Sequence, residues 1–193
     1  MRIFDISQEV FSCAVYPGDP KPEKQTLCAT ANGDLYNLTA FSMCAHNGTH
    51  IDAPFHFLSA GKTVDQMGLL PFVGDCYVAR HQGHVSAAHA ENILAQAHGA
   101  QRILIAGPAT VTAEAARIFA ASGILLLGNE SQTIGPEDGP MEVHKILLGS
   151  EVALLEGVVL TAVPEGKYFL SAPPLNLAGA DGAPCRAYLI KTE

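Results

Sequence analysis

One segment constrains the chain more than any other: His46-Asn47-Gly48-Thr49-His50-Ile51-Asp52-Ala53-Pro54-Phe55-His56-Phe57. It holds three of the eight histidines and one carboxylate, all at even-numbered positions. Its glycine, proline and β-branched residues disfavour a helix, whereas an extended chain places alternate side chains on one face. The residues that would share this face are His46, His50, Asp52 and His56.

A straight strand cannot bring these donors together. At about 3.3 Å per residue, His46 and Asp52 would lie roughly 20 Å apart, while bonds from such donors to a metal are about 2.0–2.2 Å long. We therefore expect a bend at Asn47-Gly48, because glycine adopts a positive φ easily. His46, His50 and Asp52 would then surround one divalent cation, with His56 just outside. Histidine-rich loops are often merely solvated, but the shared spacing favours a metal site.

Composition limits the kinds of partner. The 193 residues suit one domain spanning 1–193. Only 16% of the residues are charged, which suggests that another subunit covers part of the surface. The net charge of −8 disfavours nucleic acid and anionic membranes as partners, since both select a basic face. A small-molecule substrate is the expectation that remains.

The cysteines and apolar segments indicate the compartment. The five cysteines are odd in number and form no Cys-x-x-Cys pair, which is typical of reduced thiols in a cytoplasmic protein. The N-terminus lacks the long apolar stretch of a signal peptide. No segment approaches the roughly 20 apolar residues of a membrane span. We therefore expect a cytoplasmic protein.

The pattern of apolar residues predicts an α/β fold. The apolar segment Arg102–Ala106, a helix from Thr112 to Ala121 and the strand Ile124–Leu127 form a strand–helix–strand unit, which implies parallel pairing. Further predicted strands are Arg2–Ser7, Gln25–Ala29, Tyr36–Ala45, Phe72–Arg80, Glu151–Leu155, Lys167–Ala172 and Arg186–Lys191. Further predicted helices are Thr63–Leu70, Ala87–Ala97 and Met141–Gly149. Ser86 and Thr112 are the predicted N-caps of the helices that follow them. No phosphate-binding loop follows a strand.

The pattern His46-x-Gly48-Thr49-His50-x-Asp52-x-Pro54-x-His56-Phe57 resembles the signature of the metal-dependent cyclase family, which includes bacterial kynurenine formamidases and isatin hydrolases. The resemblance extends over nearly the whole chain. It implies a swivelling β/β/α-type single domain, with mixed sheets around a metal site. It also implies a homodimer or homotetramer.

The resemblance brings in two distant residues. His144 lies twelve residues before Glu156, a spacing that is weak evidence by itself. In the resembled family, a histidine and a glutamate at this separation complete a two-metal site. His46, His50 and Asp52 would bind one ion and His144 the other, with Asp52 and Glu156 bridging. A set of imidazoles and carboxylates suits Zn²⁺ or Mn²⁺, with one or two ions per subunit.

These ligands predict a hydrolase. A bound cation lowers the pKa of water from about 15.7 towards about 7, so a metal-bound hydroxide would attack an amide carbonyl. His56 would be the general acid/base that delivers a proton to the leaving nitrogen. The closest analogy is an arylformamidase that converts N-formylkynurenine into kynurenine and formate.

The predicted substrate pocket differs from that of the formamidases. Their equivalent of the loop Tyr16-Pro17-Gly18-Asp19 carries tryptophan in the place of Tyr16 and lines the substrate pocket. Glu130 and Gln132 also depart from the formamidase pattern. Three alternatives stay open: a cyclic-amide or lactone hydrolase, a non-catalytic metal-binding module, and a purely structural α/β subunit.

Overall fold

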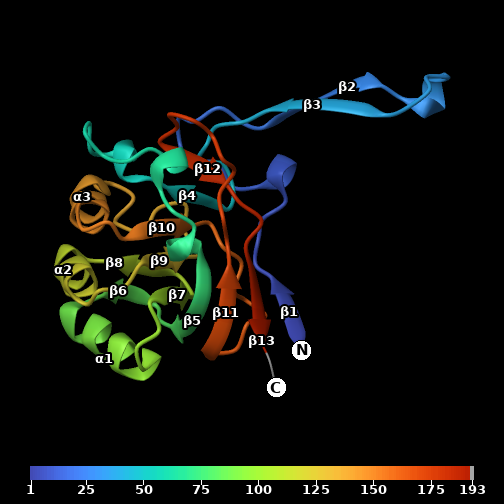
Figure 1. The fold of residues 1–193 in the computed structure, drawn as a ribbon. Coiled ribbons are helices and arrows are strands. Elements are labelled where there is room, and N and C mark those ends of the chain that lie inside the picture. Colours follow the sequence, from blue (N-terminus) through green and yellow to red (C-terminus); the bar gives the residue numbers. More distant parts are fainter. Residues whose placement is uncertain (192–193) are drawn as a thin grey trace.

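The computed structural model describes residues 1–191, which form a mixed nine-stranded sheet (Figure 1). The strand order is β1-β13-β11-β5-β7-β9-β10-β4-β12. In that order the bounds are Arg2–Asp5, Tyr188–Lys191, Gly166–Ser171, Val73–Arg80, Arg102–Ala106, Leu126–Asn129, Ala153–Glu156, His50–Asp52 and Gly182–Pro184. The predicted α/β class with mixed sheets is confirmed.

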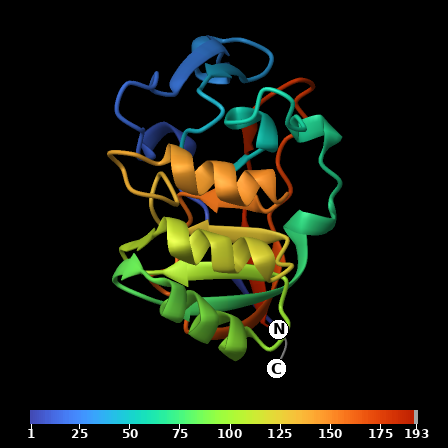
Figure 2. The ribbon, with the colours of Figure 1, turned by 90° about the vertical axis from the view of Figure 1, so that its left-hand side faces the viewer.

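The centre of the sheet is parallel, and helices cover one of its faces. Strands β5, β7, β9 and β10 run parallel, whereas the neighbouring strands at both sides are antiparallel. Helices α1 (Ala87–Ala97), α2 (Ala113–Ala121) and α3 (Met141–Gly149) stack one above another on the same face (Figure 2). Every residue of β7 is buried, as its apolar sequence predicts. The strand–helix–strand prediction is therefore correct.

Local capping signals set the helix boundaries. The Ser86 hydroxyl accepts a hydrogen bond from the backbone N–H of His89, and the Thr112 hydroxyl accepts one from that of Ala115. These bonds satisfy donors that the first helical turn leaves free. Both helices consequently begin one residue after the predicted cap. No helix in residues 1–191 is long and apolar enough to cross a bilayer.

The predicted helix Thr63–Leu70 is wrong. The structure contains two short 3₁₀ turns instead, Val64–Gln66 and Leu70–Phe72. Gly68 between them has a low helix propensity, and Pro71 disfavours a helical conformation at the residue before it. A continuous helix is therefore interrupted at both places.

A two-stranded hairpin projects from the body of the molecule (Figure 1). Its strands are β2 (Glu23–Cys28) and β3 (Leu38–Ser42), and we call residues 23–42 the β2–β3 arm. The predicted strand pair is confirmed, although both strands are shifted or shortened. The turn after β2 ends at Gly33, whose φ of 93° suits glycine. A smaller parallel pair, β6 (Gly83–Val85) and β8 (Ala109–Val111), lies beside the helices.

Candidate metal centre

The segment His46–Phe57 bends where the sequence predicts. Gly48 has a φ of +66°, and the side chain of Asn47 accepts a hydrogen bond from the backbone N–H of Cys44 at 2.8 Å. The extended part is shorter than expected, because only His50–Asp52 forms a strand. Pro54 instead begins a 3₁₀ turn that ends at His56. His56 therefore reaches the site through a turn and not through the alternation of a strand.

Sheet pairing brings the distant carboxylate to this segment. Strand β4 lies between β10 and β12, and His50 is directly opposite Glu156 of β10. Glu156 is fixed by the backbone N–H of Ile134, which donates to its Oε1 at 2.7 Å. Helix α3 contributes His144, whose Nε2 lies 3.1 Å from Oε1 of Glu156. The structure thus brings together the five predicted metal ligands and His56.

Two buried histidines face two buried carboxylates. Nε2 of His50 lies 3.3 Å from Asp52 Oδ1 and 3.5 Å from Glu156 Oε2. Nε2 of His144 lies 3.1 Å from Glu156 Oε1 and 3.5 Å from Asp52 Oδ2. All four residues are buried. Each carboxylate therefore has one oxygen toward each imidazole, which is the arrangement a bridging ligand requires.

The remaining ring nitrogens of these histidines bind the backbone. Nδ1 of His50 donates to the Gly48 carbonyl at 2.9 Å, and Nδ1 of His144 donates to the Pro140 carbonyl at 2.8 Å. Such bonds fix the tautomer and leave Nε2 with a lone pair for a metal. The backbone thus orients both rings toward the carboxylates.

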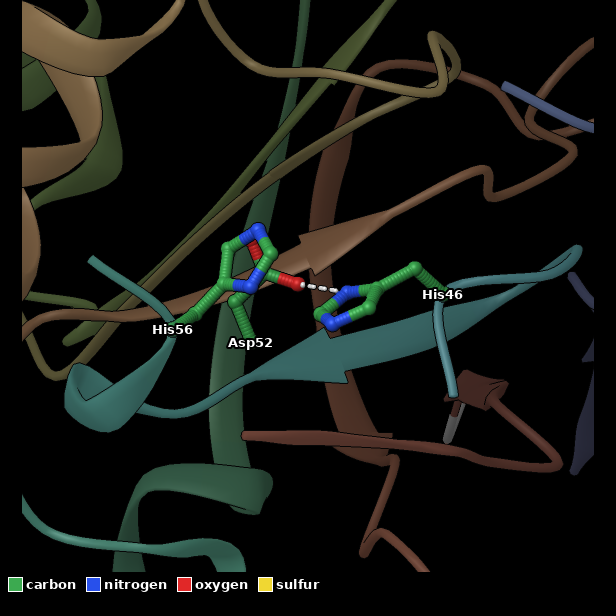
Figure 3. Close-up of side chains that lie close together, drawn as sticks. All are labelled: His46, Asp52 and His56. Atoms are coloured by element: carbon green, nitrogen blue, oxygen red, sulfur yellow. Dashed lines mark hydrogen bonds and ion pairs between the residues drawn. The ribbon is translucent and has the colours of Figure 1, made fainter. Parts of the chain in front are cut away.

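Two further histidines form the more exposed side of the site. Nδ1 of His46 lies 2.8 Å from Asp52 Oδ1, and the rings of His46 and His56 have centroids 4.1 Å apart (Figure 3). Oδ2 of Asp181 is 2.9 Å from His46 Nε2 and 3.1 Å from His56 Nδ1. Sequence reasoning missed Asp181, because a single aspartate in the glycine-rich turn before β12 carries no signal of its own.

The donor geometry suits a divalent cation. Two groups of residues have ligand atoms within 4.8 Å of one another, namely His46, Asp52 and His56, and His50, Asp52 and Glu156. Asp52 belongs to both groups. Its Oδ2 is buried and has no hydrogen-bond partner among residues 1–191. A buried carboxylate oxygen left without a donor is costly, and a cation would satisfy it.

Charges within the site perturb its pKa values. Burial lowers the pKa of His50 and of His144, but the carboxylates of Asp52 and Glu156 outweigh it and raise both pKa values to about 10. Burial raises the pKa of Asp52, yet the neighbouring imidazoles of His144, His46 and His50 outweigh it, so this pKa is well below the usual value. Without a metal, protonated imidazoles therefore neutralise the carboxylates.

These pKa values predict how metal addition stabilises the protein. In metal-free protein the two raised histidine pKa values contribute stability that is complete below pH 6.5 and is lost as the pH rises toward 10. Metal binding displaces these protons, so it strengthens as the pH rises, by about 1.4 kcal/mol per pH unit for each proton displaced. The difference in Tm between metal-loaded and chelator-treated protein should therefore grow by several degrees between pH 6.5 and 9. Thermal unfolding followed by circular dichroism would measure it, and a difference that shrinks would contradict the assignment.

Tyr16 lies on the loop before the arm. Its hydroxyl donates to the Glu137 carbonyl at 3.0 Å, which joins this loop to the segment leading into α3. The contact places Tyr16 against the loop that precedes His144. Its role toward a substrate remains a prediction.

Imidazoles and carboxylates gathered at one end of a mixed α/β sheet define a divalent-metal centre of the kind that hydrolases use. The sequence model of the Cyclase family matches residues 4–135. The kynurenine formamidase of Salinibacter ruber is 33% identical, over 98% of this chain and 97% of that protein. The chain therefore belongs to the Cyclase family, as the resemblance of residues 46–57 predicts.

Solved structures agree with this assignment. A potential metal-dependent hydrolase with cyclase activity has a TM-score of 0.84 at 27% identity, over 100% of this chain and 98% of that one. Isatin hydrolase A from Labrenzia aggregata has a TM-score of 0.85 at 21% identity, over 100% of this chain and 94% of that one. At 21% identity, the similarity to isatin hydrolase A shows the fold alone.

Proposed function

We propose that this chain is a metal-dependent hydrolase that cleaves the amide bond of an aryl formamide, with N-formylkynurenine as the closest analogy. The observation that carries the proposal is the pair of buried carboxylates, Asp52 and Glu156, each lying between His50 and His144. The similarity to kynurenine formamidases over almost the whole chain supports the amide substrate.

The proposed ligands are those predicted from the sequence: His46, His50, Asp52, His144 and Glu156. Asp52 would bridge two cations, since it belongs to both groups of ligand atoms. Glu156 would bridge as well, with Oε1 toward His144 and Oε2 toward His50. Zn²⁺ or Mn²⁺ suits these donors, with one or two ions per subunit.

In this proposal the metal ligands and His56 have different roles in the reaction. A divalent cation held by these ligands would lower the pKa of a water and polarise a carbonyl group. His56 has 27% of its side chain exposed, so it can exchange protons with a substrate that the buried histidines cannot reach. It would take a proton from the attacking water and deliver it to the leaving nitrogen, because an amine leaves poorly until it is protonated.

The test is hydrolysis by purified protein whose metal content has been measured. Protein reloaded with Zn²⁺ or Mn²⁺ should cleave N-formylkynurenine or a formyl-aniline, and chelator-treated protein should not. Isatin and simple lactones are the second set of substrates to assay. Turnover of these alone would replace the formamidase proposal with a cyclic-amide or lactone hydrolase. Metal binding without turnover of either set of substrates would indicate a non-catalytic metal-binding module.

We infer that the chain functions as one domain in a homodimer or homotetramer, and the β2–β3 arm supports this. An isolated two-stranded hairpin is only marginally stable in water. Six apolar residues on or beside the arm are each at least 42% exposed: Phe11, Leu27, Leu35, Tyr36, Leu38 and Phe41. At about 200 Å² per fully exposed side chain they amount to roughly 700 Å², close to the roughly 800 Å² per partner of a standard interface.

Disrupting the arm should therefore lower the mass of the protein in solution. The double variant Leu38→Ser, Phe41→Ser should shift the assembly toward monomer, measured by light scattering after size-exclusion chromatography. Ile3→Ser is the matched control, because Ile3 is an exposed apolar residue of β1, which lies away from the arm (Figure 1). An unchanged mass in the double variant would exclude the arm from the interface.

The five cysteines fit the proposed cytoplasmic location. Cys13, Cys28, Cys44, Cys76 and Cys185 are all free thiols. Free thiols are usual in a reducing compartment.

A further inference from the structure

One carboxylate oxygen holds two histidines of the site. Oδ2 of Asp181 contacts Nε2 of His46 and Nδ1 of His56, at 2.9 Å and 3.1 Å. A carboxylate accepts hydrogen bonds, so a proton on either of these ring nitrogens is donated to Asp181. The opposite nitrogen of His46, Nδ1, lies 2.8 Å from Asp52 Oδ1, so the His46 ring lies between two carboxylates.

We propose that Asp181 is a positioning residue that fixes the tautomers of His46 and His56 together. An imidazole that donates from one nitrogen keeps a lone pair on the other. A cation bound beside Asp52 would replace the proton on Nδ1 of His46, while Nε2 keeps its proton toward Asp181. Donation from Nδ1 leaves Nε2 of His56 free to accept a proton. The inference deepens the proposed hydrolase function and rests on it.

The position of Asp181 is set by the sheet. Gly182 of β12 is paired with Asp52 of β4, and the backbone N–H of Ala53 donates to the Asp181 carbonyl at 2.9 Å. A Cβ atom on Gly182 would lie 2.6 Å from Cε1 of His46, so this residue must lack a side chain for the strand to pass the ring. Strand pairing thus holds the Asp181 backbone against the same strand that carries His50 and Asp52.

Asp181 belongs to neither group of close ligand atoms, so we assign it an orienting role. Its side chain is 43% exposed, whereas those of Asp52 and Glu156 are almost completely buried. A carboxylate that binds the outer nitrogen of a histidine ligand fixes the ring and raises its basicity. Losing such a partner typically costs 10–100-fold in metal affinity or activity. Asp181 has this relation to His46 and, through the same oxygen, to His56.

Asp181→Ala tests the proposal. We expect kcat to fall about 10–100-fold with KM within about threefold, and the dissociation constant for Zn²⁺ to rise about 10–100-fold. Asp181→Asn keeps an acceptor oxygen, so it should recover part of both losses. Asp65→Asn is the matched control: Asp65 accepts a hydrogen bond from the Gly179 backbone of the same turn at 2.9 Å, and neither metal affinity nor kcat should change.

A direct reading of the tautomers separates positioning from general damage. In Zn²⁺-loaded wild-type protein, ¹⁵N-edited NMR of the imidazoles should show His46 protonated at Nε2 and neutral His56 protonated at Nδ1. Both assignments should be lost or averaged in Asp181→Ala. Wild-type tautomers with wild-type kcat and zinc affinity in this variant would overturn the proposal. If wild-type protein hydrolyses nothing, the hydrolase proposal fails separately, because zinc affinity and NMR still test Asp181.

Discussion

Replacing Asp52 with asparagine is expected to remove bound metal and to lower kcat/KM by at least about 10³-fold, since a metal ion supplies several kcal/mol of transition-state stabilisation. Asp52 belongs to both groups of ligand atoms and lies among His46, His50 and His144. An amide of the same size carries no charge and has only one oxygen, so it cannot bridge two cations.

Metal content by elemental analysis and turnover on the formamide panel would measure both effects. Asp75→Asn is a suitable control, because Asp75 is an exposed carboxylate on β5 and should lose neither metal nor activity. Circular dichroism would show that the Asp52 variant is folded. Full metal occupancy in folded Asp52→Asn would remove the bridging role assigned to this residue.

Replacing His56 with alanine should have the second-largest effect, a 10²–10⁴-fold loss of kcat with the metal content unchanged. The reason is that a general acid/base acts on the reacting proton and does not hold the cation. His84→Ala serves as the control, because His84 is an exposed histidine of β6 outside the site.

This variant also separates two roles that the geometry allows. His56 shares a group of close ligand atoms with His46 and Asp52, so a cation there could bind it. A loss of metal from His56→Ala, in parallel with the loss of turnover, would make His56 a ligand. Near wild-type activity would exclude both roles.

Local signals predicted much of the fold. The hydroxyl caps Ser86 and Thr112 predicted where α1 and α2 begin, because capping depends on a few neighbouring residues. The apolar segment Arg102–Ala106 predicted a strand covered on both faces. The bend at Gly48 followed from the need of His46 and Asp52 to meet.

What sequence could not predict depends on distant contacts or on short competing turns. Asp181 reaches His46 only because β12 pairs with β4, a register between segments about 130 residues apart that no local pattern encodes. The sequence predicts an extended chain up to His56. Pro54 is also favourable at the first position of a helical turn, and the structure has a 3₁₀ turn there. His144 and Glu156 were found through a family resemblance, since their spacing alone is common.

The place of β12 at the end of the sheet has a further consequence. Its partner is β4, and beyond it the sheet stops. Terminal strands open more readily than central ones, in motions that leave the rest of a protein folded. Opening of Gly182–Pro184 would carry Asp181 away from both rings while β5, β7, β9 and β10 stay paired. The rate at which a chelator removes a bound cation should therefore depend on the local opening of β12. This rate should be far less sensitive to denaturant than the rate of global unfolding is.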